Sequence, residues 1–111
     1  MADFRYKVLG QAAPAAATPT TLYTVPAATE AVGASLVICN RGISALIRVA
    51  VRVGGAATEA KHYQVYDLPL PGNDSLFLKV GLSLAATDIV EVYASTATVS
   101  FTLHGTERAV A

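Results

Sequence analysis

The sequence predicts a single all-β domain, an antiparallel β-sandwich or jelly roll of about eight strands with an extended N-terminal arm. Apolar and polar residues alternate with a period of two in most segments, and β-branched residues recur throughout the chain. No window of about a dozen residues has the i, i+3, i+4 apolar spacing of an amphipathic helix. Turn residues recur roughly every eight to twelve positions, and 111 residues suffice for one hydrophobic core.

The N-terminal region is predicted to be a strand followed by an arm. Residues 4–9 alternate loosely, as a strand does, and in residues 11–20 five alanines are interrupted by Pro14 and Pro19. The prolines leave alanine runs too short to nucleate a helix. We therefore divide the chain into a strand with an Ala/Pro-rich arm (residues 1–20), a sandwich domain (21–105) and a loose C-terminal tail (106–111).

Three strands are predicted in the first half of the domain. They cover residues 22–25, 31–39 and 44–53, and they end at a proline, an Asn-Arg-Gly turn and a glycine pair. The second strand is apolar or small on both faces, which predicts burial on both sides, with a neighbouring chain as one covering surface. The third strand alternates cleanly, so we expect a half-exposed antiparallel strand whose polar face carries Arg48 and Arg52.

Four more strands are predicted in the second half, at residues 62–68, 75–82, 88–94 and 97–103. Prolines and a Gly-Asn-Asp turn separate the first two, and residues 85–88 form the next turn. The last two strands are expected to pair as a hairpin across residues 95–96. In the final strand, Val99, Phe101 and Leu103 are expected to face the core.

Charged residues are scarce in this chain. They make up 14% of it, against 53% hydrophobic residues, whereas ordinary soluble domains carry about 25% charged residues. A small domain has much surface for its volume, so the shortage suggests that other subunits cover part of it. The alternative is that abundant alanine inflates the hydrophobic fraction. We expect a homo-oligomer, with a slight preference for a trimer.

Several classes of partner are disfavoured by the sequence. Eight basic and eight acidic residues are scattered along the chain, with no basic stripe for nucleic acid. No apolar run reaches the roughly 18 residues of a membrane helix, and the N-terminus lacks the apolar region of a secretory signal. We therefore expect synthesis and assembly in a cytoplasm, with no membrane and no nucleic acid bound.

The chain offers no clear catalytic or metal-binding pattern. His62 and His104 are far apart in sequence, and neither has a companion at metal-ligand spacing. Cys39, the only cysteine, lies in an apolar strand and is better explained as a small buried hydrophobe than as a nucleophile. Asn73 and Asp74 are explained by turn chemistry without calcium. We expect no enzyme activity, no metal and no cofactor.

Two groups of side chains could contact a partner. Arg48 and Arg52 lie four residues apart on one strand face, where they could pair with carboxylates of a neighbouring subunit or simply face solvent. Tyr66 with His62 and Gln64 could line an outward face that binds sugar. Core and interface packing explains strand tyrosines more simply, so carbohydrate binding is kept only as an alternative.

Several short segments resemble small virion proteins of tailed bacteriophages, cyanophages included. The likeness spans most of the chain, from about residue 8 to 107, and its pieces are specific mainly through their order. The matching segments are Thr21-Leu22-Tyr23-Thr24-Val25-Pro26, an apolar strand closing in Cys39-Asn40-Arg41, Lys61-His62-Tyr63, Gly72-Asn73-Asp74, residues 81–88, Val92-Tyr93-Ala94 and residues 99–105.

This resemblance implies a β-sandwich in the virion, commonly oligomeric, with no catalytic residues to carry over. A capsid decoration or cement protein is the favoured role, and a tail, baseplate or fibre component, with sugar or receptor binding, is the alternative. Partners would be further copies of the chain and other virion proteins. The expected subunit-contact residues are Phe4, Tyr6, Val8, Leu9, Arg48 and Arg52.

Overall fold

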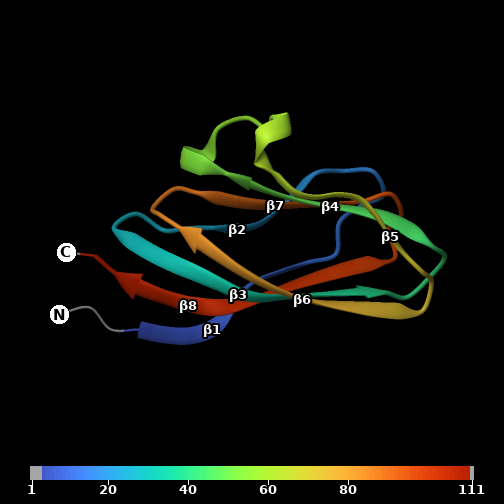
Figure 1. The fold of residues 1–111 in the computed structure, drawn as a ribbon, viewed down its shortest axis with the longest axis horizontal. Helices are drawn as coiled ribbons and strands as arrows, with labels where there is room; N and C mark the ends of the chain where they lie inside the picture. The colour runs from blue at the N-terminus through green and yellow to red at the C-terminus, as the bar shows by residue number, and fades with distance from the viewer. Residues whose placement is uncertain (1–3, 111) are drawn as a thin grey trace.

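The computed structural model describes residues 4–110, which fold into two four-stranded antiparallel sheets packed face to face (Figure 1). Sheet I has the strand order β1-β8-β3-β6, and sheet II has the order β2-β7-β4-β5. The strands of sheet I are β1 (Phe4–Ala12), β8 (Val99–Ala109), β3 (Thr29–Asn40) and β6 (Asp74–Leu84). The strands of sheet II are β2 (Thr20–Thr24), β7 (Ile89–Ala94), β4 (Ala45–Arg52) and β5 (Tyr63–Leu70).

The connections between strands make this sandwich a jelly roll. β1 pairs with β8, β2 with β7, β3 with β6 and β4 with β5, so the chain is a folded ribbon wrapped around one core. Only the β4–β5 connection stays within one sheet, and it contains two short 3-10 turns, η1 (Val53–Gly55) and η2 (Ala60–His62). None of the helical turns in residues 4–110 is long enough to cross a bilayer. The predicted fold class is confirmed.

All the expected strands are present, but the expected hairpin across residues 95–96 is wrong. β7 and β8 lie in different sheets, so residues 95–98 connect the two layers instead of turning back within one. Alternation shows which way side chains face along a strand, but it carries no information about which strand lies beside it.

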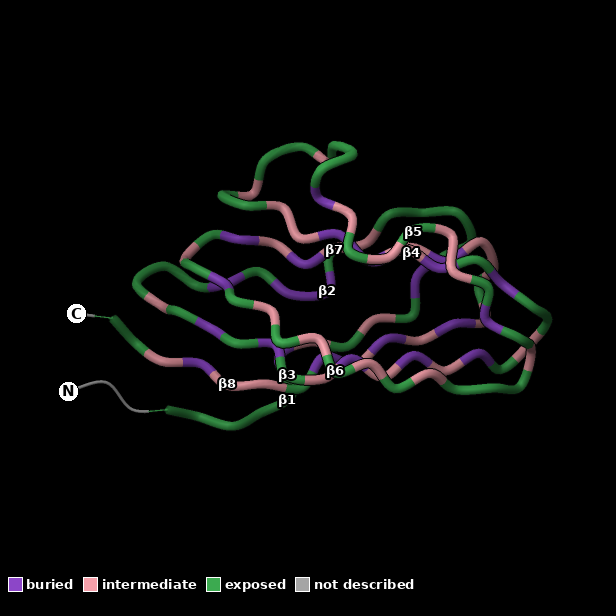
Figure 2. Tube along the Cα trace, in the orientation of Figure 1, coloured by how far each residue is buried: buried purple, intermediate pink, exposed green. Residues whose placement is uncertain are grey.

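The core lies between the two sheets, where buried and exposed residues alternate along most strands (Figure 2). Val99, Phe101 and Leu103 of β8 are completely buried, as predicted. They pack in a cluster with side chains from all of the remaining strands, β1 to β7. The completely buried members of the cluster outside β8 are Leu36, Ile38, Ile47, Val90, Val92 and Ala94. A two-layer sandwich without helices covers only the inner face of each sheet with its own side chains.

A β-bulge in β3 changes the facing predicted for that strand. The register shifts between Gly33 and Ser35 against both neighbouring strands, which leaves Ala34 without a ladder partner. Beyond the bulge, Leu36 and Ile38 face the core and the residues between them face outward. Within the single chain, residues 31–39 are therefore covered on one face only, and the extra residue reverses which side chains face the core after the bulge. Coverage of the other face by a neighbouring chain remains a prediction.

Both ends of the described chain belong to sheet I. β8 continues to Ala109 and is paired on both sides, so the expected loose tail from residue 106 is wrong over residues 106–109. Gly105, the last residue of the predicted sandwich domain, lies within β8 at a point where the backbone of β3 passes very close. A Cβ at this position would lie 2.1 Å from the carbonyl oxygen of Val32.

The predicted N-terminal strand is confirmed and longer than expected. β1 pairs with β8 along its whole length, and Leu9 joins the core. Residues 13–19 then carry the chain across to β2 in the other sheet. The start of the chain is thus part of the sandwich, and residues 1–3 of the expected arm lie outside the described residues.

At one end of the sandwich, the buried side chain of Asn40 joins three connections. Its amide nitrogen donates to backbone carbonyl oxygens at 2.6–3.3 Å, those of Ile43, Leu70 and Pro71. Its oxygen accepts from the Gly42 N–H at 3.1 Å and from the Thr98 hydroxyl at 2.8 Å. The Asn-Arg-Gly turn predicted from the sequence does not depend on a positive φ at Asn40, whose backbone lies outside that region. The side chain of Asn40 stabilises the turn through its hydrogen bonds instead.

At the opposite end, Asp88 joins the β2–β3, β4–β5 and β6–β7 connections. Its carboxylate accepts from the N–H groups of Gly54 at 2.8 Å and Ala85 at 2.9 Å. The Asp88 carbonyl accepts from the N–H of Val25 at 3.0 Å. Each end of the jelly roll is therefore held by one buried polar residue, which replaces the water that these loop backbone groups would otherwise bind.

We expect Asn40→Ala to lower the free energy of unfolding by about 2–4 kcal/mol, because it leaves buried hydrogen-bonding groups of three loops without partners. Chemical denaturation monitored by circular dichroism measures this. Ser100→Ala, on the outer face of the same sheet, is the matched control and should change stability by less than about 0.5 kcal/mol. Equal stability of the Asn40 variant and the native chain would contradict this role.

Candidate subunit-contact surfaces

The outward side chains of sheet I form a broad surface with few charges, which we call the sheet I outer face. The strand registers arrange it in five rows that run across the strands. The rows are Phe4–Arg108–Glu30, Tyr6–Thr106–Val32–Ser83, Val8–His104–Ser35–Lys79, Gln11–Thr102–Val37–Phe77 and Ser100–Cys39–Ser75.

Large apolar side chains are exposed on this face. Phe4 is 63% exposed, Tyr6 86%, Val8 43%, Val32 47% and Phe77 73%. These are half of the large hydrophobic residues found exposed in residues 4–110, and all five lie on one side of one sheet. Soluble monomers seldom expose so many on a single continuous surface, so this face is the main candidate for a protein contact.

Three of the predicted contact residues, Phe4, Tyr6 and Val8, share this face. Leu9 does not, because side chains alternate along a strand, so Leu9 faces the core where its neighbour Val8 faces outward. Contact of these residues with another subunit remains a prediction. Phe77 joins the same face through the pairing of β6 with β3.

On sheet II, Arg48 lies at the centre of an outward cluster of aromatic and acidic side chains, the arginine–tyrosine cluster. The guanidinium carbon lies 4.3 Å from the ring centres of both Tyr66 and Tyr93. Arg48 Nε also donates to Asp67 Oδ1 at 2.6 Å, and this hydrogen bond raises the pKa of Arg48. Asp67 has a φ of 51°, at a register irregularity of β5 that brings its carboxylate to Arg48.

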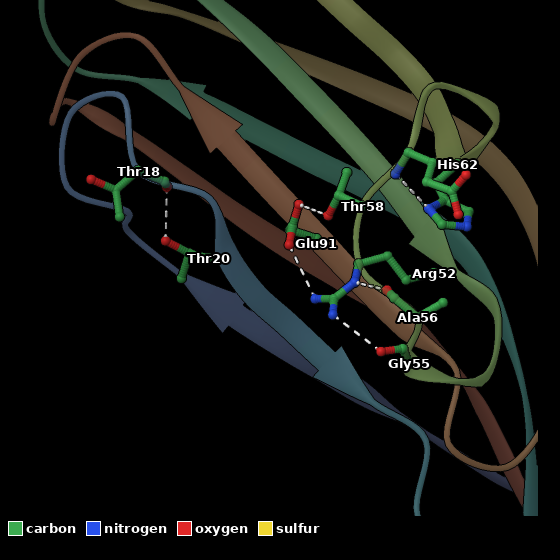
Figure 3. Close-up of polar contacts among 9 residues, drawn as sticks. Thr18, Thr20, Arg52, Gly55, Ala56, Thr58, His62 and Glu91 are labelled. Carbon is green, nitrogen blue, oxygen red and sulfur yellow. Dashed lines mark hydrogen bonds and ion pairs between the residues drawn. The ribbon is translucent and has the colours of Figure 1, made fainter.

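Arg52, four residues further along β4, holds the β4–β5 connection against the sheet (Figure 3). Its Nη1 lies 3.1 Å from Glu91 Oε2, and its other nitrogens donate to the carbonyl oxygens of Gly55 and Ala56. Thr58 donates to the second oxygen of the same Glu91 carboxylate. Arg48 and Arg52 thus share one face, as predicted, and each has a carboxylate partner within the chain; a role toward another subunit remains a prediction.

The three residues proposed as a sugar-binding face do not converge. His62 is buried, not exposed on a strand, because it ends η2 and its Nδ1 accepts from the Glu59 N–H at 2.9 Å. His62 and Gln64 line a shallow depression of about 490 Å³ beside Val51 and Val53. Tyr66 is not among its lining residues and belongs to the arginine–tyrosine cluster.

The strand β5 that carries Tyr66 also continues through Pro69, beyond its predicted end at residue 68. An edge strand tolerates a proline in this way.

Within residues 4–110, no three His, Cys, Asp or Glu side chains gather where they could hold a metal ion. His104 is exposed in the middle of β8, since that strand continues past the predicted end, and its neighbours on the face are Val8 and Ser35. Cys39 is half-buried and faces outward between Ser100 and Ser75, not into the core.

A buried hydrogen bond ties the two sheets together, and no pattern in the sequence indicated it. The Tyr23 hydroxyl of β2 donates to Glu107 of β8, and Lys7 Nζ lies 3.3 Å from the other oxygen of this carboxylate. Burial, and then the hydrogen bond to Glu107, raises the pKa of Tyr23. The same hydrogen bond lowers the pKa of Glu107, with Lys7 adding to the effect and burial opposing it. Residue 107 had been placed in a loose tail, where no such role was expected.

Comparison with known proteins identifies the fold but no family. No protein-family model and no curated protein matches this sequence. A chain in a solved structure of infectious bursal disease virus, Gx strain, matches 97% of this chain with a TM-score of 0.54 and 12% identity. This chain spans about a third (32%) of that viral chain. A pentameric capsid protein from metagenomic phage sequences matches 95% of this chain at 16% identity, with 65% of its own length covered and a TM-score of 0.36.

We expect the free energy of unfolding to fall as the pH drops below about 4.5, the ordinary pKa of a glutamate. The folded pKa of Glu107 is lowered, so its carboxylate stabilises the fold above the unfolded pKa and this contribution disappears on protonation. Glu107→Gln should therefore show a smaller loss of stability between neutral and acidic pH, measured by urea denaturation across that range. Glu30→Gln, which alters an exposed ion pair, should keep the native profile; identical profiles for all three proteins would contradict the role of Glu107.

Proposed function

We propose that this protein is a non-enzymatic structural component of a virus particle that binds neighbouring subunits through the sheet I outer face. The observation that carries the proposal is the exposure of Phe4, Tyr6, Val8, Val32 and Phe77 on one face of one sheet. Burial of apolar surface contributes roughly 25 cal/mol per Å² before association costs are subtracted. In a particle, many equivalent copies repeat the same contact, so even a modest contact is maintained.

The fold and the composition support the same proposal. A jelly roll is an architecture common in viral capsid domains, although lectins and cupins also use it, so the fold is an analogy and not a proof of function. The likeness to a chain of infectious bursal disease virus extends over nearly the whole sequence. A charged fraction of 14% and a formal net charge of zero suit a permanently assembled subunit better than a free monomer.

Within the particle, we favour a capsid decoration or cement protein of a tailed bacteriophage, assembled in the host cytoplasm. The phage assignment depends on the resemblance of short segments in the sequence. A tail, baseplate or fibre position is the alternative, and the trimer favoured from the sequence remains a prediction. A cryo-EM map of the particle would distinguish a position on the shell from one on the tail.

We expect this protein in purified particles at a fixed ratio to the major shell or tail protein. Quantitative mass spectrometry of gradient-purified particles of the virus that encodes this chain measures that ratio. A structural component keeps a constant ratio through successive gradients and salt washes. Its absence from washed particles, or a ratio that falls at each wash, would contradict the proposal.

A recognition module for a sugar or receptor is the second candidate, and the arginine–tyrosine cluster is the observation that favours it. Tyr66 is 57% exposed beside Arg48, and exposed rigid aromatic and arginine side chains are frequent in binding hot spots. However, the ring of Tyr66 already contacts the Arg48 guanidinium and the edge of Tyr63. These contacts engage part of the ring within the chain and leave just over half of the residue accessible to a ligand.

If the protein binds sugar through this cluster, Tyr66→Ala should abolish the signal of the native chain on a glycan array, because it removes the exposed ring. Phe77→Ala is the control, since it removes an even more exposed aromatic ring from the opposite sheet. We expect no glycan binding by the native chain. A specific signal that is lost in Tyr66→Ala and kept in Phe77→Ala would favour the recognition module.

A further inference from the structure

We propose that the partner of the sheet I outer face is a second copy of this chain, related by a two-fold axis that runs along the strands between β8 and β3. The inference depends on the proposed function only in taking this face as the contact surface. It names the partner, the symmetry and the pairs of side chains that meet. It also replaces the trimer expected from the sequence.

The size of the face suits a second copy. Four strands at about 4.8 Å spacing and about nine residues at 3.3 Å each give a surface of roughly 19 by 30 Å. Two copies would then bury about 1,100 Å² in total, which exceeds the roughly 1,000 Å² that separates biological interfaces from most crystal contacts and is close to the lower limit for a stable one. Sheets stack face to face at about 10 Å, and the outward residues of β8 and β3 at the centre of the face are mostly small or medium-sized.

The charges of the face distinguish between two possible two-fold arrangements. With the axis along the strands, β8 of one copy lies over β3 of the other, so Arg108 lies opposite Glu30 in both directions. In the same arrangement Lys79 lies over Val8, where its aliphatic stem can pack. With the axis across the strands, Lys79 of one copy would instead face Lys79 of the other. Only the first arrangement brings opposite charges together and separates like charges.

The bulky side chains also fit the first arrangement. Tyr6 lies in the second row at the β1 edge, and Phe77 lies in the fourth row at the β6 edge. A two-fold axis along the strands places Tyr6 over Ser83 of the other copy and Phe77 over Gln11. Large side chains therefore lie opposite small or flexible ones and not opposite each other, as a self-complementary isologous contact requires.

The only cysteine provides a direct probe of the axis. With the axis along the strands, the two Cys39 residues lie on adjacent strand positions of stacked sheets, about 11 Å apart. With the axis across the strands, Cys39 of one copy lies near the first row of the other, and the two thiols are roughly 27 Å apart. Each copy carries one cysteine, so a bifunctional thiol reagent can join two copies and no more.

The experiment combines sedimentation velocity at rising protein concentration with cross-linking of Cys39 by a short bis-maleimide. We expect a concentration-dependent dimer and a cross-linked product of twice the chain mass. Phe77→Lys should weaken the dimer at least about tenfold, because it removes an aromatic contact and buries a charge twice per dimer. Ile43→Lys is the matched control, since Ile43 is also 73% exposed but lies in the β3–β4 connection, away from this face.

A charge-swap series tests the proposed Arg108–Glu30 contact. Glu30→Arg should weaken the dimer, and the double variant Glu30→Arg with Arg108→Glu should restore it, because both the internal and the intermolecular pairs are rebuilt with opposite polarity. Glu30, Ile43 and Phe77 are exposed and Arg108 is partly exposed, so circular dichroism should show the native fold in every variant.

The inference is overturned if the native chain stays monomeric at about 100 µM, forms a trimer, or dimerises without a Cys39 cross-link. It is also overturned if Phe77→Lys and Ile43→Lys weaken the dimer equally. A chain that is monomeric in solution but constant in washed particles would reject this dimer and leave the structural role intact. A dimer that is absent from particles would reject the structural role and leave the dimer.

Discussion

The constraint on which the structure depends is that two stacked sheets have four faces and cover only two of them. With no helix to lie over either sheet, the inner faces bury the core around Phe101, and each outer face must meet either solvent or another molecule. Sheet II covers part of its outer face with the β4–β5 connection, which Arg52 and Glu91 hold in place. Among residues 4–110, no connection covers the outer face of sheet I in this way, and its outward side chains are largely uncharged.

Holding the two layers together is a separate task, performed by a few buried polar groups. Each end of the jelly roll brings several connections close to one another, and their backbone groups would be left without partners if they were merely packed. Asn40 and Asp88 each satisfy groups from three connections at their own end. Tyr23 and Glu107 add a bond from one sheet to the other. These contacts lie inside the domain, so the outer face of sheet I can differ in composition without loss of the fold.

The candidate site was only partly visible in the sequence. The contact residues expected from the sequence included Phe4, Tyr6, Val8 and Leu9, and the structure places the first three on one face and Leu9 in the core. Their companions Val32 and Phe77 could not be grouped with them, because β3 and β6 reach this face only through pairings between residues distant in the chain. The role of Glu107 was also hidden, since no local pattern links it to Tyr23, which is 84 positions away.

What the sequence determined by itself is local: the existence of the strands, the side of most strands that faces the core, and the shortage of charge. These follow from the period-two geometry of an extended backbone and from composition, which need no knowledge of neighbours. Only the tertiary structure decided which strands pair, that β7 and β8 separate into different sheets, and that a bulge reverses the faces of β3. The physical reason is that pairing and bulges depend on hydrogen bonds between segments far apart in sequence, such as Val8 with His104, and no periodic pattern records them.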